Sequence, residues 1–222
     1  MNPSPRPAPK ASSATWAGLF LALFGLLIAR WAVSLFYPEF SFIGMVWKEA
    51  LYWTCLVALF LIIRRGEHLR VTSVNLGTAP IKSSLLWGII LAVLCGLVGG
   101  VVVGLTHFKG GAMGEALAKL PLWLVILVVL RAGVIEEFFY RGFAIERLQL
   151  LGLNRYWAGA IPLFIFGFAH ATNGWGNVIL ALALGAVLTI VYLWRRDLVA
   201  NFIGHFLIDF VLVVLPRFVS HH

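Results

Sequence analysis

Charged residues are scarce in this chain. Only 12% of its 222 residues are Asp, Glu, Lys or Arg, while 61% are hydrophobic, and the mean hydropathy is +0.95. Soluble domains carry roughly 45–50% apolar and about 25% charged residues. The shortage of charge therefore excludes an ordinary soluble domain and indicates a polytopic membrane protein, long enough for one helix bundle.

Acidic residues are scarcer than basic ones, with nine Asp and Glu against 17 Lys and Arg, so the formal net charge is +8. Such an excess can indicate nucleic-acid binding, but the positive-inside rule accounts for it better in a membrane protein. We therefore expect no nucleic-acid partner and an N-terminus in the cytoplasm. With that orientation the inside segments hold Arg6, Lys10, Arg64, Arg65, Arg70, Lys82, Arg147, Arg155, Arg195 and Arg196, and the outside segments hold Lys48, Lys109, Lys119 and Arg217.

Several motifs of known chemistry are missing. The two cysteines, Cys55 and Cys95, lie in apolar runs, where a free thiol packs as a small hydrophobic group. Without a CxxC pair, neither a disulfide framework nor a cysteine metal site is predicted. HExxH is also absent, and no Ser–His pair or reactive cysteine stands at a plausible position. A covalent nucleophile is therefore disfavoured.

Long apolar runs predict an all-α fold, a transmembrane bundle of seven to eight spans. The first 15 residues are rich in Pro, Ser and Ala and are predicted to be a disordered tail. We divide the rest into N-terminal transmembrane helices (16–83), a core (84–215) and a short tail (216–222). The expected spans are 16–36, 45–63, 84–106, 120–147, 157–170, 175–194 and 198–215.

Two adjacent carboxylates, Glu136 and Glu137, interrupt the fourth run. An acidic residue at the centre of a membrane helix costs roughly 2.5–3.5 kcal/mol on the mildest scale. Arg141 lies four residues after Glu137, one helical turn away, so an ion-pair partner is at hand. We expect that pair to be mainly structural. Glu136 has no such partner and is the first candidate for chemistry.

Further polar residues lie in the late runs. His170 ends the fifth run, and His205 and Asp209 stand four residues apart in the last one, with Asn201 one turn earlier on the same face. Ionisable groups at membrane depth face the bundle interior, so we expect them to converge on one water-accessible cavity. Taken singly, each has a structural alternative. A membrane histidine or Asn201 can simply join two helices by a hydrogen bond.

Three motifs follow one another on three apolar runs. They are EExxxR at Glu136, Glu137 and Arg141, FxxxH at Phe166 and His170, and HxxxN/D at His205 and Asp209. In this order and spacing they resemble the CPBP family of intramembrane proteases, which includes the type II CAAX prenyl endopeptidases and the Abi proteins of bacteriocin immunity. The resemblance covers roughly residues 84–215, which it implies are the protease core, and leaves the first two spans as variable additions.

The resemblance also implies roles for these residues. Glu136 would be the general base on a water shared with His170, and His205 with Asp209 would support the oxyanion. Glu137, Arg141, Phe166 and Asn201 would be supporting residues. The departure is Asp209, where the prenyl endopeptidases usually have Asn. An Asn amide can donate to an oxyanion and an ionised Asp cannot, so Asp209 is either protonated or orients His205.

The same residues are compatible with another mechanism and with other functions. Glu136, His170 and His205 make a two-histidine, one-carboxylate set of the kind that binds catalytic zinc, so the sequence does not decide between a glutamate-based protease and a zinc metalloprotease. No cofactor is certain. An immunity or regulatory membrane protein that binds peptides is an alternative function. A small transporter is disfavoured because no inverted repeat is visible.

Depth in the bilayer gives a further expectation. At about 1.5 Å per residue, Glu136 lies about 8 Å from the inner face of a ~30 Å hydrocarbon core. The same rise puts His170 about 21 Å from Tyr156 and therefore deeper. If the residues nevertheless meet, the cavity opens toward the cytoplasm. The expected partners are then the lipid bilayer and a peptide or protein with a membrane-proximal or prenylated segment.

Overall fold

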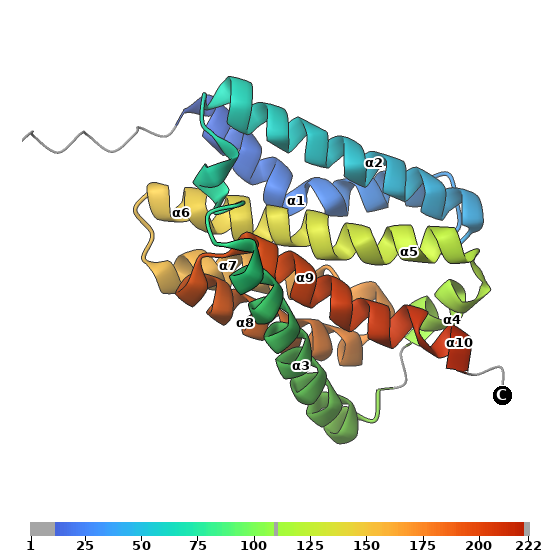
Figure 1. Cartoon of the computed structure of the whole chain (residues 1–222). Coiled ribbons are helices and arrows are strands. Elements are labelled where there is room, and N and C mark those ends of the chain that lie inside the picture. The colour runs from blue at the N-terminus through green and yellow to red at the C-terminus, as the bar shows by residue number, and fades with distance from the viewer. Residues whose placement is uncertain (1–11, 109–110, 220–222) are drawn as a thin grey trace, which may run out of the picture.

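The computed structural model describes residues 12–108 and 111–219 (Figure 1). Within these ranges the secondary structure is helical and contains no strand, which confirms the all-α class. The predicted disordered tail falls largely on residues 1–11, outside the described part. Helix α1 begins at Ser13, three residues before the first predicted span. Ser12 caps it, because its hydroxyl accepts a hydrogen bond from the Thr15 backbone N–H.

Every predicted hydrophobic run coincides with helical structure. Three helices continue into π-helix, in which the backbone bonds connect residues five apart. The elements are α1 (Ser13–Ser34), α2 (Phe42–Leu61) with a π turn (Ile62–Gly66), a 3-10 turn (Val71–Val74), α3 (Ile81–Thr106), α4 (Gly111–Lys119), α5 (Leu122–Arg131), the π-helix η3 (Ala132–Ile145), α6 (Glu146–Leu150), α7 (Arg155–Phe168), a 3-10 turn (Ala171–Asn173), α8 (Trp175–Arg195), α9 (Leu198–Asp209), a π turn (Phe210–Val214) and α10 (Pro216–Val219).

The described helices include five that are long and apolar enough to cross a membrane, and the protein is an integral membrane protein. The runs predicted at 120–147 and 157–170 are helical but do not qualify. The first carries charged residues in its middle, and the 14 residues of α7 rise only about 21 Å against the ~30 Å of a hydrocarbon core. A count of seven to eight spans is therefore not confirmed. The five are Ser13–Ser34, Phe42–Gly66, Ile81–Thr106, Trp175–Arg195 and Leu198–Phe218.

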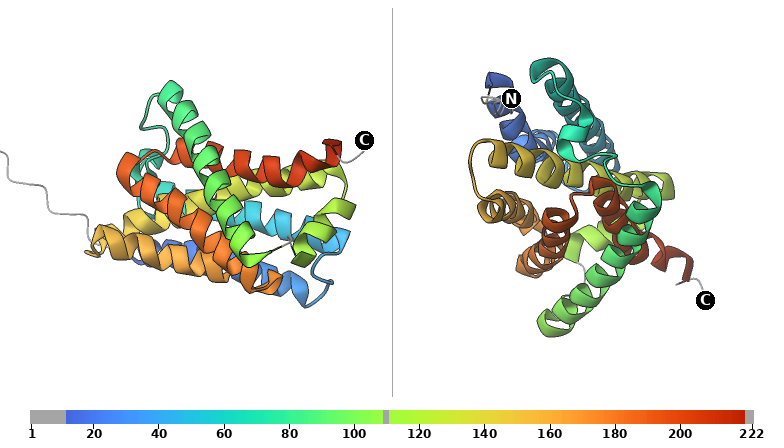
Figure 2. Two further views of the ribbon diagram at one scale, coloured as in Figure 1. Left: turned by 90° about the horizontal axis from the view of Figure 1, so that it is seen from below. Right: turned by 60° about the vertical axis from the view of Figure 1, so that its left-hand side comes forward.

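The continuous helix α5–η3–α6 occupies the middle of the bundle (Figure 1). Helices α1 and α2 pack together along one side of it, and α7, α8 and α9 lie on the other side. Helix α3 crosses α8 and α9 obliquely, as the two turned views of Figure 2 show. This arrangement places the motifs of η3, α7 and α9 around a common interior.

One glycine permits the close contact between η3 and α9. A Cβ atom at Gly133 would lie 2.9 Å from the backbone nitrogen of Phe206 and 3.1 Å from the carbonyl oxygen of Phe202. These are backbone atoms, which cannot move aside as a side chain can. Small residues allow helix backbones to approach closely in membranes. Gly133 thus allows side chains of η3 to reach those of α9.

Candidate active site

Four side chains from three helices line one cavity of about 400 Å³. Glu136 comes from η3, His170 follows the end of α7, and His205 and Asp209 come from α9. The rest of the wall is mostly apolar and includes Val128, Leu184 and other aliphatic side chains, so we call this the apolar cavity. The estimate from helical rise put His170 deeper than the others. Even so, the structure brings all four candidate residues of the sequence together.

Glu137 is fully buried and holds three neighbours at once. Its Oε1 accepts a hydrogen bond from Arg141 Nη1 at 2.7 Å, and the i,i+4 ion pair suggested by the sequence is present. The same oxygen lies 2.8 Å from Nδ1 of His205, and Asn201 Nδ2 donates to Oε2 at 2.9 Å. Because the carboxylate is paired with Arg141, His205 is the donor in their hydrogen bond. Glu137 therefore orients His205 as well as pairing with Arg141, a contact that sequence reasoning missed.

His205 is bonded at one ring nitrogen and faces a second carboxylate with the other. Glu137 accepts from Nδ1, and Nε2 lies 3.6 Å from Oδ2 of Asp209. The Asp209 side chain is 28% exposed and lines the apolar cavity, so it is the more accessible of the two carboxylates. Asn201 does not line that cavity. Its Nδ2 also donates to the Leu188 carbonyl of α8, so the structure shows it joining helices.

His170 is oriented by its own helix end. Its Nδ1 donates to the Phe166 carbonyl at 2.8 Å, since a carbonyl oxygen can only accept. That bond leaves Nε2 without a proton in the neutral ring. The Phe166 ring packs edge-on against both histidines, with ring centres 4.9 Å apart for His170 and 6.3 Å apart for His205, and the Arg141 guanidinium lies 4.6 Å from its centre. Phe166 therefore contacts both imidazoles and covers the buried ion pair.

Glu136 is bound by Arg131, a residue not singled out from the sequence. Arg131 Nη1 donates to Glu136 Oε1, and its Nε donates to Glu49 Oε1 of α2 at 3.2 Å. The described residues provide no hydrogen-bond partner for Glu136 Oε2, since the bond from Arg131 goes to Oε1. The carboxylate is thus fixed through one oxygen, while the other remains for a water or a substrate.

Comparison with known proteins gives one family. Residues 118–211 match the family model described as type II CAAX prenyl endopeptidase Rce1-like. The resemblance is confirmed for this segment. No curated protein and no protein of solved structure matches the chain. The family that this Rce1-like segment matches is one of endopeptidases, which are proteases and hence hydrolases.

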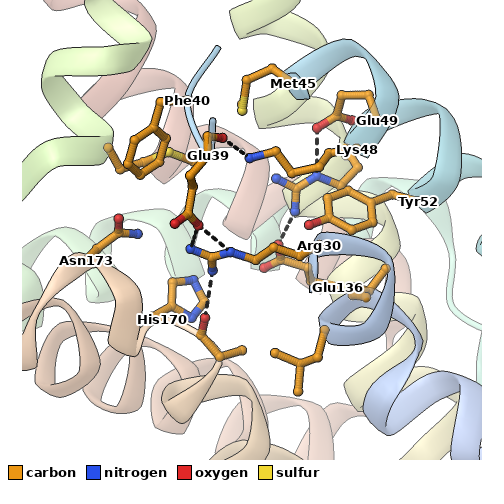
Figure 3. A pocket seen from close by; sticks show the side chains of 15 residues that line it. Arg30, Glu39, Phe40, Met45, Lys48, Glu49, Tyr52, Glu136, His170 and Asn173 are labelled. Carbon is orange, nitrogen blue, oxygen red and sulfur yellow. Dashed lines mark hydrogen bonds and ion pairs between the residues drawn. The ribbon is translucent and has the colours of Figure 1, made fainter. Parts of the chain in front are cut away.

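All four candidate residues lie in the Rce1-like segment, but part of their surroundings does not. A second cavity of about 100 Å³ is lined by Glu136 and His170 together with charged side chains of α1, α2 and the loop between them (Figure 3). We call it the charged cavity. It meets the apolar cavity at Met113, Arg131, Glu136 and His170, which line both. The charged side chains from outside the segment are Arg30, Glu39, Lys48 and Glu49.

Arg30 ties the first helix to the end of α7. Its Nη1 donates to the Ala169 carbonyl at 3.1 Å, its Nη2 donates to the Thr172 hydroxyl, and Glu39 accepts from its Nε at 2.7 Å. Ala169 and Thr172 flank His170 in the chain, so Arg30 fixes the turn that carries this histidine. Lys48, assigned to an outside segment from the sequence, is instead a buried residue of α2 that donates to the Glu39 carbonyl.

The charged residues of the charged cavity could have been singled out in the sequence, because they interrupt apolar runs. Lys48 and Glu49 are adjacent charges in an apolar run, as Glu136 and Glu137 are, and Arg30 and Arg131 are charges within other runs. The cost of a membrane-buried charge applies to all of them equally. What the sequence lacked was a local partner for each, because the contacts that satisfy them join distant segments.

The two-histidine, one-carboxylate zinc arrangement would need Glu136, His170 and His205 to meet around one metal ion. Among the described residues, no group of three His, Cys, Asp or Glu side chains is placed to hold a metal ion. The reason lies in existing bonds, since Arg131 holds Glu136 and His205 is engaged at Nδ1 by Glu137 and faces Asp209 with Nε2. Glu136, His170 and His205 therefore do not fit a zinc site as they stand.

Proposed function

We propose that this protein is an intramembrane endopeptidase that cleaves membrane-proximal or lipidated peptide substrates with a water activated by Glu136 and His170. The observation that carries the proposal is the meeting of Glu136, His170, His205 and Asp209 in one cavity, within a segment that matches a family of endopeptidases. Peptide hydrolysis needs an activated water, a proton donor for the leaving amine and support for the oxyanion.

The first requirement falls to Glu136 and His170. A water that donates one hydrogen bond to Glu136 Oε2 and one to His170 Nε2 would be held by two acceptors, both without a partner in the described part of the chain. Glu136 takes the proton as the water attacks the carbonyl carbon. The same carboxylic acid then donates it to the leaving nitrogen.

Oxyanion support falls to His205 and Asp209. With a proton on both nitrogens, His205 keeps its bond to Glu137 through Nδ1, which balances its charge, and offers Nε2–H to the oxyanion. A protonated Asp209 would offer a second donor. The buried bonds of Glu137 to Arg141 and Asn201 fix the imidazole, so the donor is oriented before the substrate binds.

The two cavities suggest how a substrate lies. The apolar cavity of about 400 Å³ suits a hydrophobic segment or a lipid chain, and the charged cavity of about 100 Å³ suits a short polar segment. Since Glu136 and His170 line both, the scissile bond would sit where they meet. The basic residues predict a cytoplasmic N-terminus. The cavities are lined from the loop between α1 and α2 and from α4, at the end of the bundle opposite to the start of α1 (Figure 1), so in that orientation the site would open toward the outer side and not toward the cytoplasm.

The test is cleavage by the purified protein in detergent micelles. The probes are two fluorogenic peptides of one sequence, one with a farnesylated cysteine near its C-terminus and one without the lipid. Wild type, Glu136→Gln and His170→Ala are compared, with Glu115→Gln as a control because Glu115 is exposed on α4. We expect a loss of about 10²-fold or more in both site variants and none in the control.

Each other outcome has a meaning. Cleavage that survives in Glu136→Gln would refute the proposed mechanism. Loss of cleavage on addition of a chelator, restored by zinc, would show that a metal takes part and that the side chains rearrange to hold it. Peptide binding without cleavage in the wild type would favour an immunity or regulatory protein.

A further inference from the structure

Helix α2 contacts the candidate base through Arg131. Glu49 accepts from Arg131 Nε at 3.2 Å, and Arg131 Nη1 donates to Glu136 (Figure 3). The ring of Tyr52, one turn along α2 from Glu49, lies with its centre 5.1 Å from the guanidinium carbon. The guanidinium is therefore held by α2 on one edge and one face. Glu49 and Tyr52 both lie outside residues 118–211.

The anchoring of Arg131 decides how it can bind Glu136. A free guanidinium pairs with a carboxylate through two parallel N–H groups, one to each oxygen. Here the Nε edge is bonded to Glu49, and Nη1 alone reaches Glu136. The hydrogen bond from Arg131 occupies Oε1 of Glu136, and no hydrogen bond to Oε2 is found among the described residues. That second oxygen is the one that the proposed reaction requires.

We infer that Glu49 is a positioning residue that, by holding Arg131, keeps one oxygen of Glu136 free to take a proton from water. The inference rests on the proposed function. Without Glu49, Arg131 turns and covers both oxygens of Glu136, and the base is blocked although the fold is intact. The hairpin of α1 and α2 then contributes directly to the active site.

Burial supports this role. The Glu49 side chain is 3% exposed, and its Oε2 has no hydrogen-bond partner in the described residues. A buried carboxylate with an unpaired oxygen is costly, and a buried ion pair is weak evidence of net stabilisation. Glu49 is therefore poorly explained as a contribution to stability. Its contact with Arg131, the arginine that binds Glu136, explains its presence better than a contribution to stability does.

The experiment compares kcat and KM for the farnesylated fluorogenic peptide. Glu49→Leu removes the acceptor for Arg131, and we expect kcat to fall about tenfold or more with KM unchanged, because the base is lost while the cavities stay open. Glu67→Leu is the matched control. Glu67 forms an equally buried pair with Arg147, also through a residue outside the matched segment, and neither lines the two cavities. Its kcat should stay within about twofold of wild type.

A second substitution separates positioning from mere packing. In the Glu49→Leu background, Arg131→Lys should raise kcat again, because an ammonium is a single point of charge and cannot cover both carboxylate oxygens. A purely structural role predicts a further loss. Equal kcat in wild type and Glu49→Leu would overturn the inference, as would a further fall in the double variant.

A replacement variant and a parallel measurement complete the experiment. If Glu49→Leu does not fold, Glu49→Met replaces it, because Met keeps the length of the side chain and removes the acceptor for Arg131 Nε. A lowered kcat at unchanged KM relative to Glu67→Met then supports the inference, while an unchanged kcat refutes it. Glu136→Gln is measured alongside. Absence of cleavage in the wild type defeats the proposed function, and survival of cleavage in Glu136→Gln defeats the proposed mechanism. Loss of cleavage in Glu136→Gln together with an unaffected Glu49→Leu defeats the positioning role alone.

Discussion

Replacing Glu137 by Gln perturbs the most fully bonded carboxylate of the site. The side chain is completely buried, and its two oxygens accept three hydrogen bonds, from Arg141 Nη1, His205 Nδ1 and Asn201 Nδ2. In Glu137→Gln one oxygen becomes an NH₂ group, so one of the three donors meets another donor. The substitution keeps shape and volume and changes only charge and hydrogen bonding.

The magnitude follows from these contacts. Breaking a buried ion pair by removing one charge costs about 3–5 kcal/mol, and a buried donor left unpaired costs about 1–3 kcal/mol. The Gln oxygen can still accept from Arg141, which also keeps its bonds to the Gly185 carbonyl and the Thr189 hydroxyl. We therefore expect a loss near the lower end, about 3 kcal/mol of unfolding free energy.

The assay is equilibrium unfolding of the purified protein in mixed micelles, with kcat measured on the same preparations. The exposed Glu115→Gln should change the unfolding free energy by no more than about 0.5 kcal/mol. The kcat of Glu137→Gln should fall because His205 loses its orientation. A destabilisation below about 1 kcal/mol, or an unchanged kcat, would refute the view that Glu137 organises the site.

Three further substitutions test the surroundings. Gly133→Ala would place a Cβ 2.9 Å from backbone atoms of α9 and should cost about 1–3 kcal/mol in the same unfolding assay, whereas Gly100→Ala meets nothing within 4 Å and should be neutral or slightly stabilising. Asp209→Asn should retain or raise kcat, because an amide donates to an oxyanion; a loss of about 10²-fold would show that the charge on this residue is needed. Arg30→Gln should lower kcat by loosening the turn that carries His170, and an unchanged kcat would show that this turn holds itself.

Much of the helical framework follows from the sequence alone. Apolar runs located the helices because each has to satisfy its backbone groups internally in lipid. The number of spans did not follow as well. The run around Glu136 and the run before His170 are hydrophobic enough to suggest membrane spans. The first is interrupted by charges, however, and the second is too short. Length and charge thus limit what hydropathy can decide.

The spacing of the motifs predicted the candidate residues. The cost of burying a charge in the membrane predicted that these residues share one cavity. His205 and Asp209 are four apart on an α-helix, and their proximity could be read directly. The bond between Glu137 and His205 could not, since these residues are 68 positions apart. Its existence depends on the close approach of η3 and α9 at Gly133, which only packing reveals.

The contact of Arg131 with Glu136 shows why helical spacing misled. On an α-helix, residues five apart point about 140° away from each other, so no ion pair is expected between them. The π-helix that starts at Ala132 bonds residues five apart and brings such side chains onto one face. Glu136 appeared unpaired in the sequence because an α-helical period was assumed for this segment. The same change of period turns Glu136 toward Arg131 and α2 while Glu137 meets α9, so the two adjacent carboxylates reach different partners and can take different parts in the reaction.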